Sequence, residues 1–598
     1  MEGPAIVLAG PGSGKTTVIT HRIKNLIEKG VSPEKIMVVT FTKAAAVHMQ
    51  KKFFGIMDGE NWVKGSYPVT FGTFHSIYYK ILRLSCGYRG DNIITDRMQY
   101  DILKEIILRK KIEAGNTFDF IQNILGEIGK VKGNMIDLQE YEPKCCKMED
   151  FMLIFQEYEN ALEAERRMDF DDILLNCHKL FVERPDVLRK WQNIFQYILI
   201  DEFQDINMIQ YQVVKMLALP ENNLFIVGDD DQSIYGFRGA CPEIMPQFMT
   251  EFENGKKIIM NINYRSTPEI VNASEKLIKN NHKRLQKNIV SNHHHGKEVD
   301  VRQFKNQTEE LNYTVKMIQQ LISNGIKIED MAILVRNNSQ ILQIENFLKN
   351  KNINSSGAKK KQNNMYKGQI AQDIISYVKA ALSYQQMPLR ENEHFIRIMN
   401  KPYRYISRQV IGSRPVNFEE LINIYSHSRE VLNHIKQLQF HLDMIAKLNP
   451  AAAVMYIRNG TGYEKYLRQY AMEHKLDFAD LNKQMEDINS DAHRFNTLNA
   501  WLENSENGVS NELKSDNRGI NIMTMHGAKG LEYKAVFLLD VNQGIIPTSK
   551  ALREKDFEEE RRVFYVALTR AAEILCVYGI AESLGCEVEM SVFAKEII

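Results

Sequence analysis

Residues with the chemistry to hold a phosphate stand near the start of the chain, directly after a short apolar run. Ala5–Leu8 lead into a glycine-rich loop with a lysine and two threonines, and a helical pattern follows. This order is typical of a phosphate-binding loop, because backbone N–H groups at the helix start converge on phosphate oxygens. We expect Lys15 to reach the β- and γ-phosphates of a nucleotide and Thr16 to ligate Mg²⁺. The residues predicted to bind nucleotide are Ala9, Gly10, Pro11, Gly12, Ser13, Gly14, Lys15, Thr16 and Thr17.

A pair of carboxylates follows another apolar run, Tyr197–Ile200. Ligands of parallel α/β sheets bind beyond the carboxyl ends of the strands, so Asp201 and Glu202 are expected beside the phosphate loop. Asp201 is predicted to hold Mg²⁺, and Glu202 to orient the attacking water. Acidic residues at a strand end are common and a glycine turn can simply start a helix, so it is the combination that predicts a nucleotide hydrolase.

A third loop, Gly228–Ala240, follows the apolar run Leu224–Val227 and mixes acidic, amide and aromatic side chains. One of its polar residues is expected to sense the γ-phosphate. Tyr235, Phe237 and Arg238 are aromatic and cationic groups of the kind on which the bases of a single strand stack, so we expect them to face single-stranded nucleic acid. An acidic surface loop with its aromatics packed in the core is the alternative on spacing alone.

These loops need strands to position them, and the chain offers two sets of short, β-branched apolar runs separated by helical patterns. The first set is Ala5–Leu8, Ile36–Thr40, Tyr197–Ile200 and Leu224–Val227. The second set is Ile258–Ile262, Val299–Phe304, Met331–Val335, Ile520–Met525, Val536–Leu539 and Ile574–Val577. Such runs are typical of parallel strands covered on both faces, so two doubly wound α/β domains are predicted.

Two long helical stretches interrupt these domains. The predicted division is a first domain of 1–84 and 171–257 with a helical insertion at 85–170, and a second of 258–354 and 517–598 with a helical insertion at 355–516. Within the second insertion, breaks are expected at Pro402, Pro415, Pro450 and Gly460–Gly462.

Composition bounds the class of protein. The 598 residues predict about three to five folding units. Hydrophobic residues at 44% and charged residues at 25% exclude a largely disordered chain. Because the chain has 76 basic and 75 acidic residues, it can bind nucleic acid only through a local groove and not through its overall electrostatic field. The chain has no long apolar run, and its seven scattered cysteines include no Cys-x-x-Cys pair. We therefore expect no membrane span, no zinc site and a cytoplasmic location.

Further segments complete a series that resembles the superfamily 1 DNA helicases of the UvrD/Rep/PcrA family over nearly the whole chain. They are Thr40–Ala45, Gly72–His75, Met168–Asp172, Asn263–Ser266, Thr524–Glu532, Glu558–Arg562 and Tyr565–Ala571. The resemblance implies two RecA-like P-loop NTPase domains with parallel sheets, ATP between them, and a mainly helical insertion in each.

The resemblance also implies residue roles. Gln232 would sense the γ-phosphate, Arg265 and Arg570 would act as arginine fingers, and Tyr264 and Glu532 would lie near adenine and ribose. The implied catalytic residues are therefore Lys15, Glu202, Gln232, Arg265 and Arg570. The residues implied at single-stranded DNA are Phe41, Thr73, His75, Tyr235, Phe237, Arg238, His526 and Lys529.

The implied function is a helicase or translocase in DNA repair or replication. Single-stranded DNA would stimulate hydrolysis of ATP with Mg²⁺, and hydrolysis would drive 3′→5′ movement and unwinding at single-strand/double-strand junctions. The family's adenine-reading segment is expected to be absent, because Met1 lies so close to Ala9. Alternatives are a nucleotide-gated DNA-binding protein or protein-displacing translocase with little strand separation, and the motor subunit of a helicase–nuclease.

Three departures from the family bear on DNA binding, and two of them concern duplex handling. Phe237 stands where a tryptophan is usual, so weaker stacking on DNA is expected. Gly579–Val592 holds no aromatic residue for a strand-separating pin, and Pro402–Ser407 replaces a Gly-Ile-Gly turn in the duplex-gripping insertion. Translocation is therefore better supported than strand separation.

Overall fold

The computed structural model describes residues 2–58, 67–110, 112, 117–236, 239–356, 366, 368–384, 392–411, 416–473, 478–510, 519–549, 551, 557–583 and 586–598. It divides into two compact units. One unit comprises residues 1–113, 119–355 and 518–598, and the other comprises residues 114–118 and 356–517. The predicted four-part division of the chain stays a prediction.

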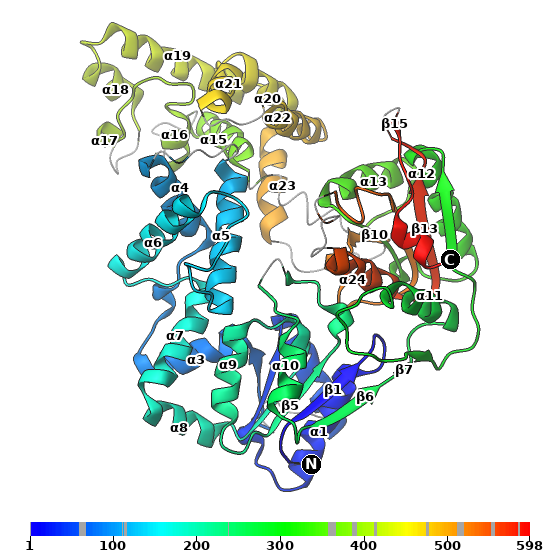
Figure 1. The fold of residues 1–598 in the computed structure, drawn as a ribbon. Helices are drawn as coiled ribbons and strands as arrows, with labels where there is room; N and C mark the ends of the chain where they lie inside the picture. Colours follow the sequence, from blue (N-terminus) through cyan, green and yellow to red (C-terminus); the bar gives the residue numbers. More distant parts are fainter. Residues whose placement is uncertain are drawn as a thin grey trace. The chain divides into compact units, whose positions relative to one another are not determined.

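The first unit contains a parallel six-stranded sheet in the order β3-β2-β4-β5-β1-β6. Figure 1 shows three of its strands, β5, β1 and β6, side by side. Its strands are β1 (Ala5–Ala9), β2 (Ile36–Thr40), β3 (Thr70–Thr73), β4 (Tyr197–Ile200), β5 (Leu224–Gly228) and β6 (Lys256–Met260). All four runs of the first predicted set are strands of this sheet. β3 was not predicted, because Gly72 interrupts its apolar pattern.

The prediction that Ile258–Ile262 belongs to the second sheet is wrong. β6 pairs with β1, from Ala5 opposite Lys256 to Ala9 opposite Met260, and so extends the first sheet to Met260. The next residues, β7 (Ile262–Asn263), pair instead with β8 (Val290–Ser291). An apolar run predicts a strand but not its partner, and β6 is an edge strand whose side chains are only partly covered.

Helices cover both faces of the first sheet because alternate residues of each strand point to opposite sides. Ile6 and Leu8 of β1 pack in one core, whereas Ala5, Val7 and Ala9 pack in another. The helices around the sheet are α1 (Lys15–Glu28), α2 (Lys43–Asp58), α3 (Phe74–Cys86), α7 (Phe170–Glu183), α8 (Pro185–Ile194), α9 (Met208–Ala218) and α10 (Ile244–Glu251). The stretch between α3 and α7 is helical as predicted, with α4 (Asp96–Lys110), α5 (Thr117–Asn134) and α6 (Met148–Ala164).

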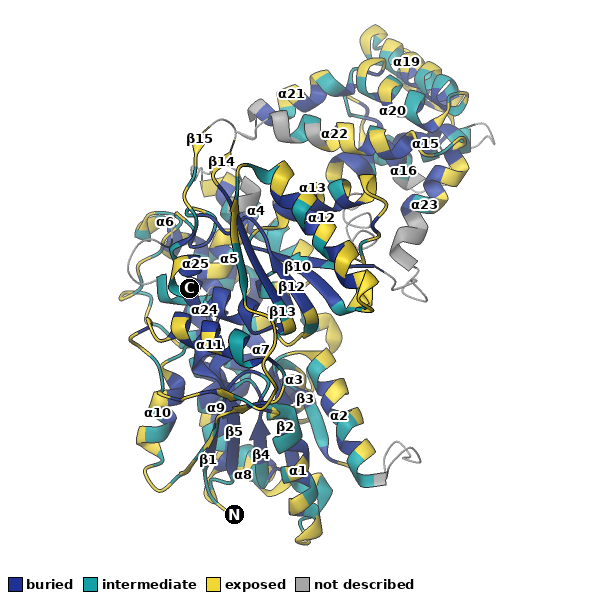
Figure 2. Ribbon diagram, turned by 90° about the vertical axis from the view of Figure 1, so that its right-hand side faces the viewer, coloured by how far each residue is buried: buried dark blue, intermediate teal, exposed yellow. Residues whose placement is uncertain are grey.

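A second parallel sheet, in the order β11-β10-β12-β13-β9, lies in the same unit, and Figure 2 shows its inner strands β10, β12 and β13 largely buried. Its strands are β9 (Asp300–Phe304), β10 (Met331–Val335), β11 (Asn521–Thr524), β12 (Tyr533–Leu538) and β13 (Ala571–Ile580). Two cores flank it. Its helices are α11 (Pro268–Ile278), α12 (Gln307–Ser323), α13 (Asn338–Asn350), α24 (Phe557–Leu568) and α25 (Val592–Glu596).

The second unit is helical and has its own core, in which Trp501, Tyr377 and Tyr463 are among the largest buried side chains. Its helices are α15 (Gln369–Tyr384), α16 (Asn392–Ile398), α17 (Arg408–Ile411), α18 (Phe418–Ile424), α19 (Arg429–Ala446), α20 (Pro450–Asn459), α21 (Tyr463–Glu473), α22 (Phe478–Ala492) and α23 (Leu498–Ser510). The predicted breaks at Pro450 and Gly460–Gly462 are confirmed as the two ends of α20, while Pro415 lies outside the described residues. No helix of the described residues is long and apolar enough to cross a membrane.

Candidate nucleotide site and DNA-contact residues

The glycine-rich loop joins β1, an inner strand of the first sheet, to α1. Gly12 and Gly14 have φ angles of 66° and 87°, a left-handed conformation that glycine adopts without steric cost. The Ser13 hydroxyl donates to the Gly10 carbonyl at 2.7 Å, so the loop closes on itself before α1 begins at Lys15. Because the first N–H groups of a helix have no partner within it, this geometry fits a bound phosphate.

Residues Asn263–Arg265 lie directly against this loop. The Tyr264 N–H donates to the Gly12 carbonyl at 3.0 Å. A Cβ at Gly12 would lie 2.7 Å from both the Arg265 Cβ and the Asn263 Oδ1, so only glycine allows this approach. The structure therefore brings Tyr264, whose side chain is 55% exposed, beside the loop. A contact between Tyr264 and adenine stays a prediction.

The predicted acid pair lies at the end of β4. The Glu202 N–H donates to the Asp201 Oδ1 at 3.0 Å, and Glu202 adopts a left-handed φ of 52°. Non-glycine residues in this conformation are uncommon and concentrate at functional sites.

Burial and the charge of Glu202 raise the pKa of Asp201 to about 7, against the opposing effect of Lys15. Burial also acts to raise the pKa of Glu202, but Lys15 and Lys529 outweigh it and hold that pKa below its usual range. Glu202 is thus ionised at neutral pH, as a residue that orients water must be. Burial is the larger cause of this raised pKa, and Glu202 adds a second carboxylate beside Asp201. The Asp201 oxygen, with the Thr16 hydroxyl, is the kind of ligand that Mg²⁺ prefers. The donor set therefore fits a magnesium ion.

Gln232 lies in a short 3₁₀ turn, Asp230–Gln232, after β5. Its Nε2 donates to the Asp229 Oδ2 at 2.5 Å. The Asp229 N–H in turn donates to the Gln204 Oε1 at 2.9 Å, and the Gln204 Nε2 donates to Glu202. Gln204, which sequence reasoning did not assign, connects the two acidic loops. Its place within Asp201–Asp205 was the only signal.

The two predicted arginine fingers are both engaged within the protein. The Arg265 Nε donates to the Glu532 Oε2 at 2.7 Å, and its Nη1 donates to the Thr569 carbonyl at 3.2 Å. Arg570 is buried and donates to the carbonyls of Val566 and Leu531 at 2.9 and 3.1 Å. Burial, with a smaller contribution from Arg265, lowers the pKa of Arg570 to about 9.

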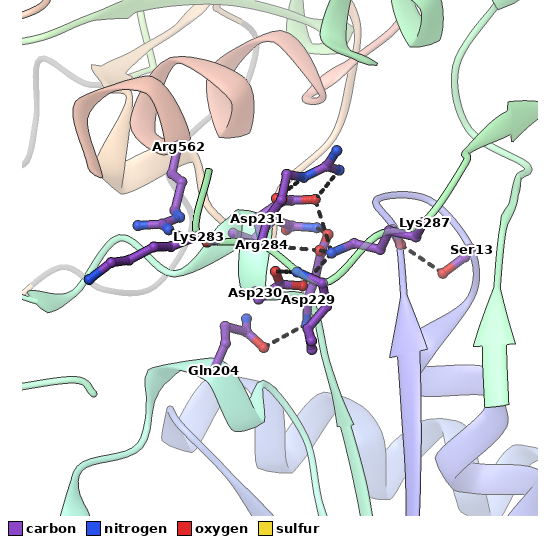
Figure 3. A network of polar contacts seen from close by, with 12 residues as sticks. Ser13, Gln204, Asp229, Asp230, Asp231, Lys283, Arg284, Lys287 and Arg562 are labelled. Atoms are coloured by element: carbon purple, nitrogen blue, oxygen red, sulfur yellow. Dashed lines mark hydrogen bonds and ion pairs between the residues drawn. The ribbon is translucent and has the colours of Figure 1, made fainter. Parts of the chain in front are cut away.

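Three consecutive aspartates, Asp229–Asp231, surround the ammonium of Lys287 (Figure 3). Arg284 also pairs with Asp231 through its Nε and Nη2, at 3.0 and 2.7 Å. Neither basic residue was found from the sequence. The run of acids indicates a need for positive charge, but no spacing rule identifies which distant cation supplies it.

The residues predicted at DNA form two groups in the structure. In the first, the rings of Phe41 and Tyr235 stack with centroids 5.3 Å apart, and the Lys529 ammonium lies 4.9 Å from the Tyr235 ring. The Lys529 side chain is buried. Its ammonium pairs with Asp205 at 2.5 Å and donates to the Gln232 carbonyl at 2.7 Å. Its contact with DNA stays a prediction. Phe237 and Arg238 lie outside the described residues.

The second group lies at the start of α3 and α7. Thr73 caps α3 by accepting from the Ser76 N–H. Burial lowers the pKa of His75, so its ring is neutral at pH 7, and it lies 5.6 Å from the ring of Phe170. Phe170 is 56% exposed. Sequence reasoning placed Phe170 in a motif without a role, and its exposure beside His75 adds it to the candidates for base stacking. His526 is half-buried in a 3₁₀ turn, His526–Ala528, between β11 and β12.

Comparison with known proteins agrees with this geometry. Residues 1–253 match the model of the UvrD/REP helicase N-terminal domain, and residues 258–581 match the UvrD-like helicase C-terminal domain. YjcD of Bacillus subtilis, named as an ATP-dependent DNA helicase, is 31% identical over 96% of this chain and 76% of its own length. A DNA helicase II homolog of Mycoplasma capricolum is 31% identical over 96% and 82%, and the ATP-dependent DNA helicase PcrA of Staphylococcus aureus is 30% identical over 96% and 81%.

These matches confirm the predicted fold class, and the two parallel sheets are RecA-like P-loop folds. They also confirm the resemblance drawn from the motifs. The chain belongs to the UvrD/Rep family of helicases.

Proposed function

We propose that the chain is an ATP-dependent DNA helicase or translocase, in which single-stranded DNA stimulates ATP hydrolysis and hydrolysis drives 3′→5′ movement. The observation that carries the proposal is the convergence of charged residues on one glycine loop. Lys15 acts electrostatically on Asp201, Glu202 and Asp229, which follow two different strands, while Asn263–Arg265 packs on Gly12. The names of the relatives support both ATP and DNA as substrates.

The proposed chemistry uses the side chains in the states described above. Lys15 holds the β- and γ-phosphates, and ionised Glu202 accepts a hydrogen bond from the attacking water. Gln232 senses the γ-phosphate, and Tyr264 and Glu532 contact adenine and ribose. When bound, Mg²⁺ would neutralise developing charge on the phosphate oxygens, with Thr16 and Asp201 as the residues that hold it.

The state of the two arginines supports a gated reaction. Charge on the transferred phosphoryl group is stabilised by guanidinium groups that reach it. Arg265 is occupied by Glu532 and Thr569, and Arg570 by two backbone carbonyls. Each must exchange these partners to contact a phosphate, so we expect hydrolysis to be slow until a rearrangement frees them.

The first group of DNA-contact candidates, Phe41, Tyr235 and Lys529, connects the proposed DNA surface to the hydrolytic residues. A base that stacks on Phe41 or Tyr235 would disturb the Tyr235 ring beside Lys529. Lys529 also contacts the backbone carbonyl of Gln232 and lowers the pKa of Glu202. We propose that DNA binding reaches the hydrolytic residues through these contacts.

A translocase with little strand separation is a second candidate. After β13 the chain forms a hairpin of β14 (Glu582–Ser583) and β15 (Cys586–Glu587). Gly579–Val592 contains no aromatic side chain to hold a base pair open at a junction. We also propose a preference for junctions, a role in DNA repair or replication, and a cytoplasmic location.

The test is steady-state ATP hydrolysis with Mg²⁺, with and without a long single-stranded DNA. We expect strong stimulation by DNA, a loss of about 100-fold or more in kcat for Glu202→Gln, and no turnover for Lys15→Ala with single-strand binding retained. A kcat of Glu202→Gln within about tenfold of the unsubstituted chain, or measurable turnover of Lys15→Ala, would overturn the site assignment. Partial duplexes with 3′ or 5′ tails then test direction and separation, and displacement of streptavidin from end-biotinylated single strands tests translocation alone.

A further inference from the structure

The proposed mechanism gives no role to Lys287, a buried cation. Lys287 follows α11 in the chain, far from the loop it contacts, and its side chain has no exposed surface. Its Nζ lies 2.9 Å from the Asp229 Oδ1 and 2.9 Å from the Asp231 Oδ2, and it also contacts Asp230 (Figure 3). Three carboxylates this close resemble a metal site, but the ammonium itself occupies the space between them.

Asp229 connects this cation to the hydrolytic residues. One of its oxygens accepts from Lys287, and the other accepts from the Gln232 Nε2 at 2.5 Å. Burial acts to raise the pKa of Asp229, but Lys287 and Lys15 hold it below its usual range. Asp229 is therefore an ionised carboxylate that can only accept hydrogen bonds.

An acceptor in this place determines how the Gln232 amide is turned. The NH₂ group must face Asp229, so the Oε1 faces the opposite way, where it can accept from water or a hydroxyl. If Asp229 rotated or became protonated, the amide could flip and exchange its donor and acceptor. A buried ammonium that contacts all three aspartates opposes both changes, since removing it leaves a buried charge unpaired.

We infer that Lys287 is a positioning residue for ATP hydrolysis, which fixes Asp229 so that Asp229 fixes the orientation of the Gln232 amide. The inference rests on the proposed function, in which Gln232 senses the γ-phosphate. It separates Lys287 from its neighbour Arg284, which contacts Asp231 and does not touch Asp229. Arg284→Met therefore removes a cation from the same cluster and serves as the matched control.

The experiment compares DNA-stimulated ATP hydrolysis of the full chain carrying Lys287→Met, Lys287→Arg or Arg284→Met. We expect Lys287→Met to lower kcat about tenfold or more with the affinity for ADP changed less than about threefold, because ADP lacks the γ-phosphate that Gln232 senses. Lys287→Arg should recover part of the rate. Arg284→Met should stay within about threefold of the unsubstituted chain. A kcat within twofold for Lys287→Met, or an equal loss for Arg284→Met, would overturn the inference.

A double-substitution cycle with Gln232→Ala separates positioning from general damage. If Lys287 acts through Gln232, adding Lys287→Met to Gln232→Ala should lower kcat by less than about twofold further. A full additional tenfold loss would show that Lys287 acts elsewhere and would leave the proposed function intact. If Gln232→Ala itself leaves turnover unchanged, the sensing role fails and the inference falls with it, while Lys15→Ala still reports on the phosphate loop.

A second variant covers the case in which Lys287→Met does not fold. Asp229→Asn keeps the size of the side chain but presents an amide to both Lys287 and Gln232. We expect a fall in kcat of about fivefold or more that is lost in the Gln232→Ala background, with melting behaviour measured in parallel. An unchanged kcat for a folded Asp229→Asn protein would also contradict the inference.

Discussion

Two buried lysines of the first unit have nearly the same surroundings. Lys287 lies among Asp229, Asp230 and Asp231. Lys132 lies 2.9 Å from Asp169, 2.7 Å from Asp172 and 2.7 Å from Glu159, and its side chain is 1% exposed. In both clusters the carboxylates outweigh burial and raise the pKa of the lysine above its ordinary value.

The two clusters differ in what their carboxylates contact next. Asp229 accepts from the amide of Gln232, the residue that we propose senses the γ-phosphate. Asp169 and Asp172 instead form a capping box at the start of α7, in which each accepts from the other's N–H, and Asp169 also accepts from the Tyr158 hydroxyl. Lys132 thus joins α5, α6 and α7. The ionic chemistry is the same in both clusters. The role of each cluster therefore depends on the other groups that its carboxylates contact.

The largest effect is expected on the free energy of unfolding, when the cluster around Lys132 is disrupted. Lys132→Met leaves buried carboxylates without their cation, which should lower the free energy of unfolding by about 3–5 kcal/mol. The folded fraction should hydrolyse ATP in the absence of DNA within about threefold of the unsubstituted chain. Denaturant unfolding and basal ATP hydrolysis measure the two effects. The comparison would break if Lys132→Met lowered basal kcat as strongly as Lys287→Met, and Lys132→Arg is the control that keeps the positive charge.

A smaller effect is expected on the affinity for single-stranded DNA, at an exposed residue next to Asp169 in the chain. Phe170 lies between Asp169 and Asp172 in the chain and is 56% exposed beside His75. Phe170→Ala should weaken single-strand binding by about 1–3 kcal/mol, because one stacking surface is lost. Its effect on stability should be small, since the ring is largely exposed.

Fluorescence anisotropy with a labelled oligonucleotide measures the Phe170→Ala effect, and Phe170→Tyr is the matched control that keeps a stacking ring. Unchanged affinity in Phe170→Ala would remove this group from the DNA surface and leave Lys132 with a purely structural cluster.

The smallest effect concerns a carboxyl beside the Lys287 cluster. Glu275 of α11 lines a small cavity with Pro11, Tyr565 and other residues, and neither of its carboxyl oxygens has a hydrogen-bond partner among the described residues. Burial raises the pKa of Glu275 to about 7, with Arg284, Lys279 and Lys287 acting against it and Asp231 acting with it.

The sign of the pH dependence follows from this shift. The folded state binds the Glu275 proton more tightly than the unfolded state, so stability falls as the pH rises from about 4.5 to about 7. Glu275→Gln removes that titration. Its stabilising effect should be larger at pH 8 than at pH 5.5 by about 1–2 kcal/mol, as measured by denaturant unfolding at the two pH values. A gain that does not change with pH would mean that Glu275 titrates normally.

Much of the nucleotide site was predictable because its residues follow strands directly. Lys15, Asp201 and Gln232 come just after the carboxyl ends of β1, β4 and β5, and the ends of neighbouring parallel strands meet at one edge of a sheet. Local patterns therefore located these residues before their neighbours were known. Nine of the ten predicted apolar runs are strands of the expected sheet, and Ile258–Ile262 failed because its partner β1 is distant in the chain.

Contacts between distant segments were not predictable. The structure pairs the ammonium of Lys529 with Asp205, a contact that the sequence did not indicate, while the DNA contact implied for Lys529 by the resemblance stays a prediction. Likewise, the pairing of Arg265 with Glu532 joins segments 267 residues apart. Nothing in residue type or spacing distinguishes these cations from the many others in the chain.

The sequence alone determined the family, the glycine loop and the strand-end acids, because a phosphate-binding loop needs specific residues at consecutive positions. Only the tertiary structure decided which charges neutralise one another, and hence that Lys287 serves Gln232 while Lys132 serves α7. Ion pairing acts over a few ångströms in space, whatever the separation along the chain, so it leaves no local pattern to read.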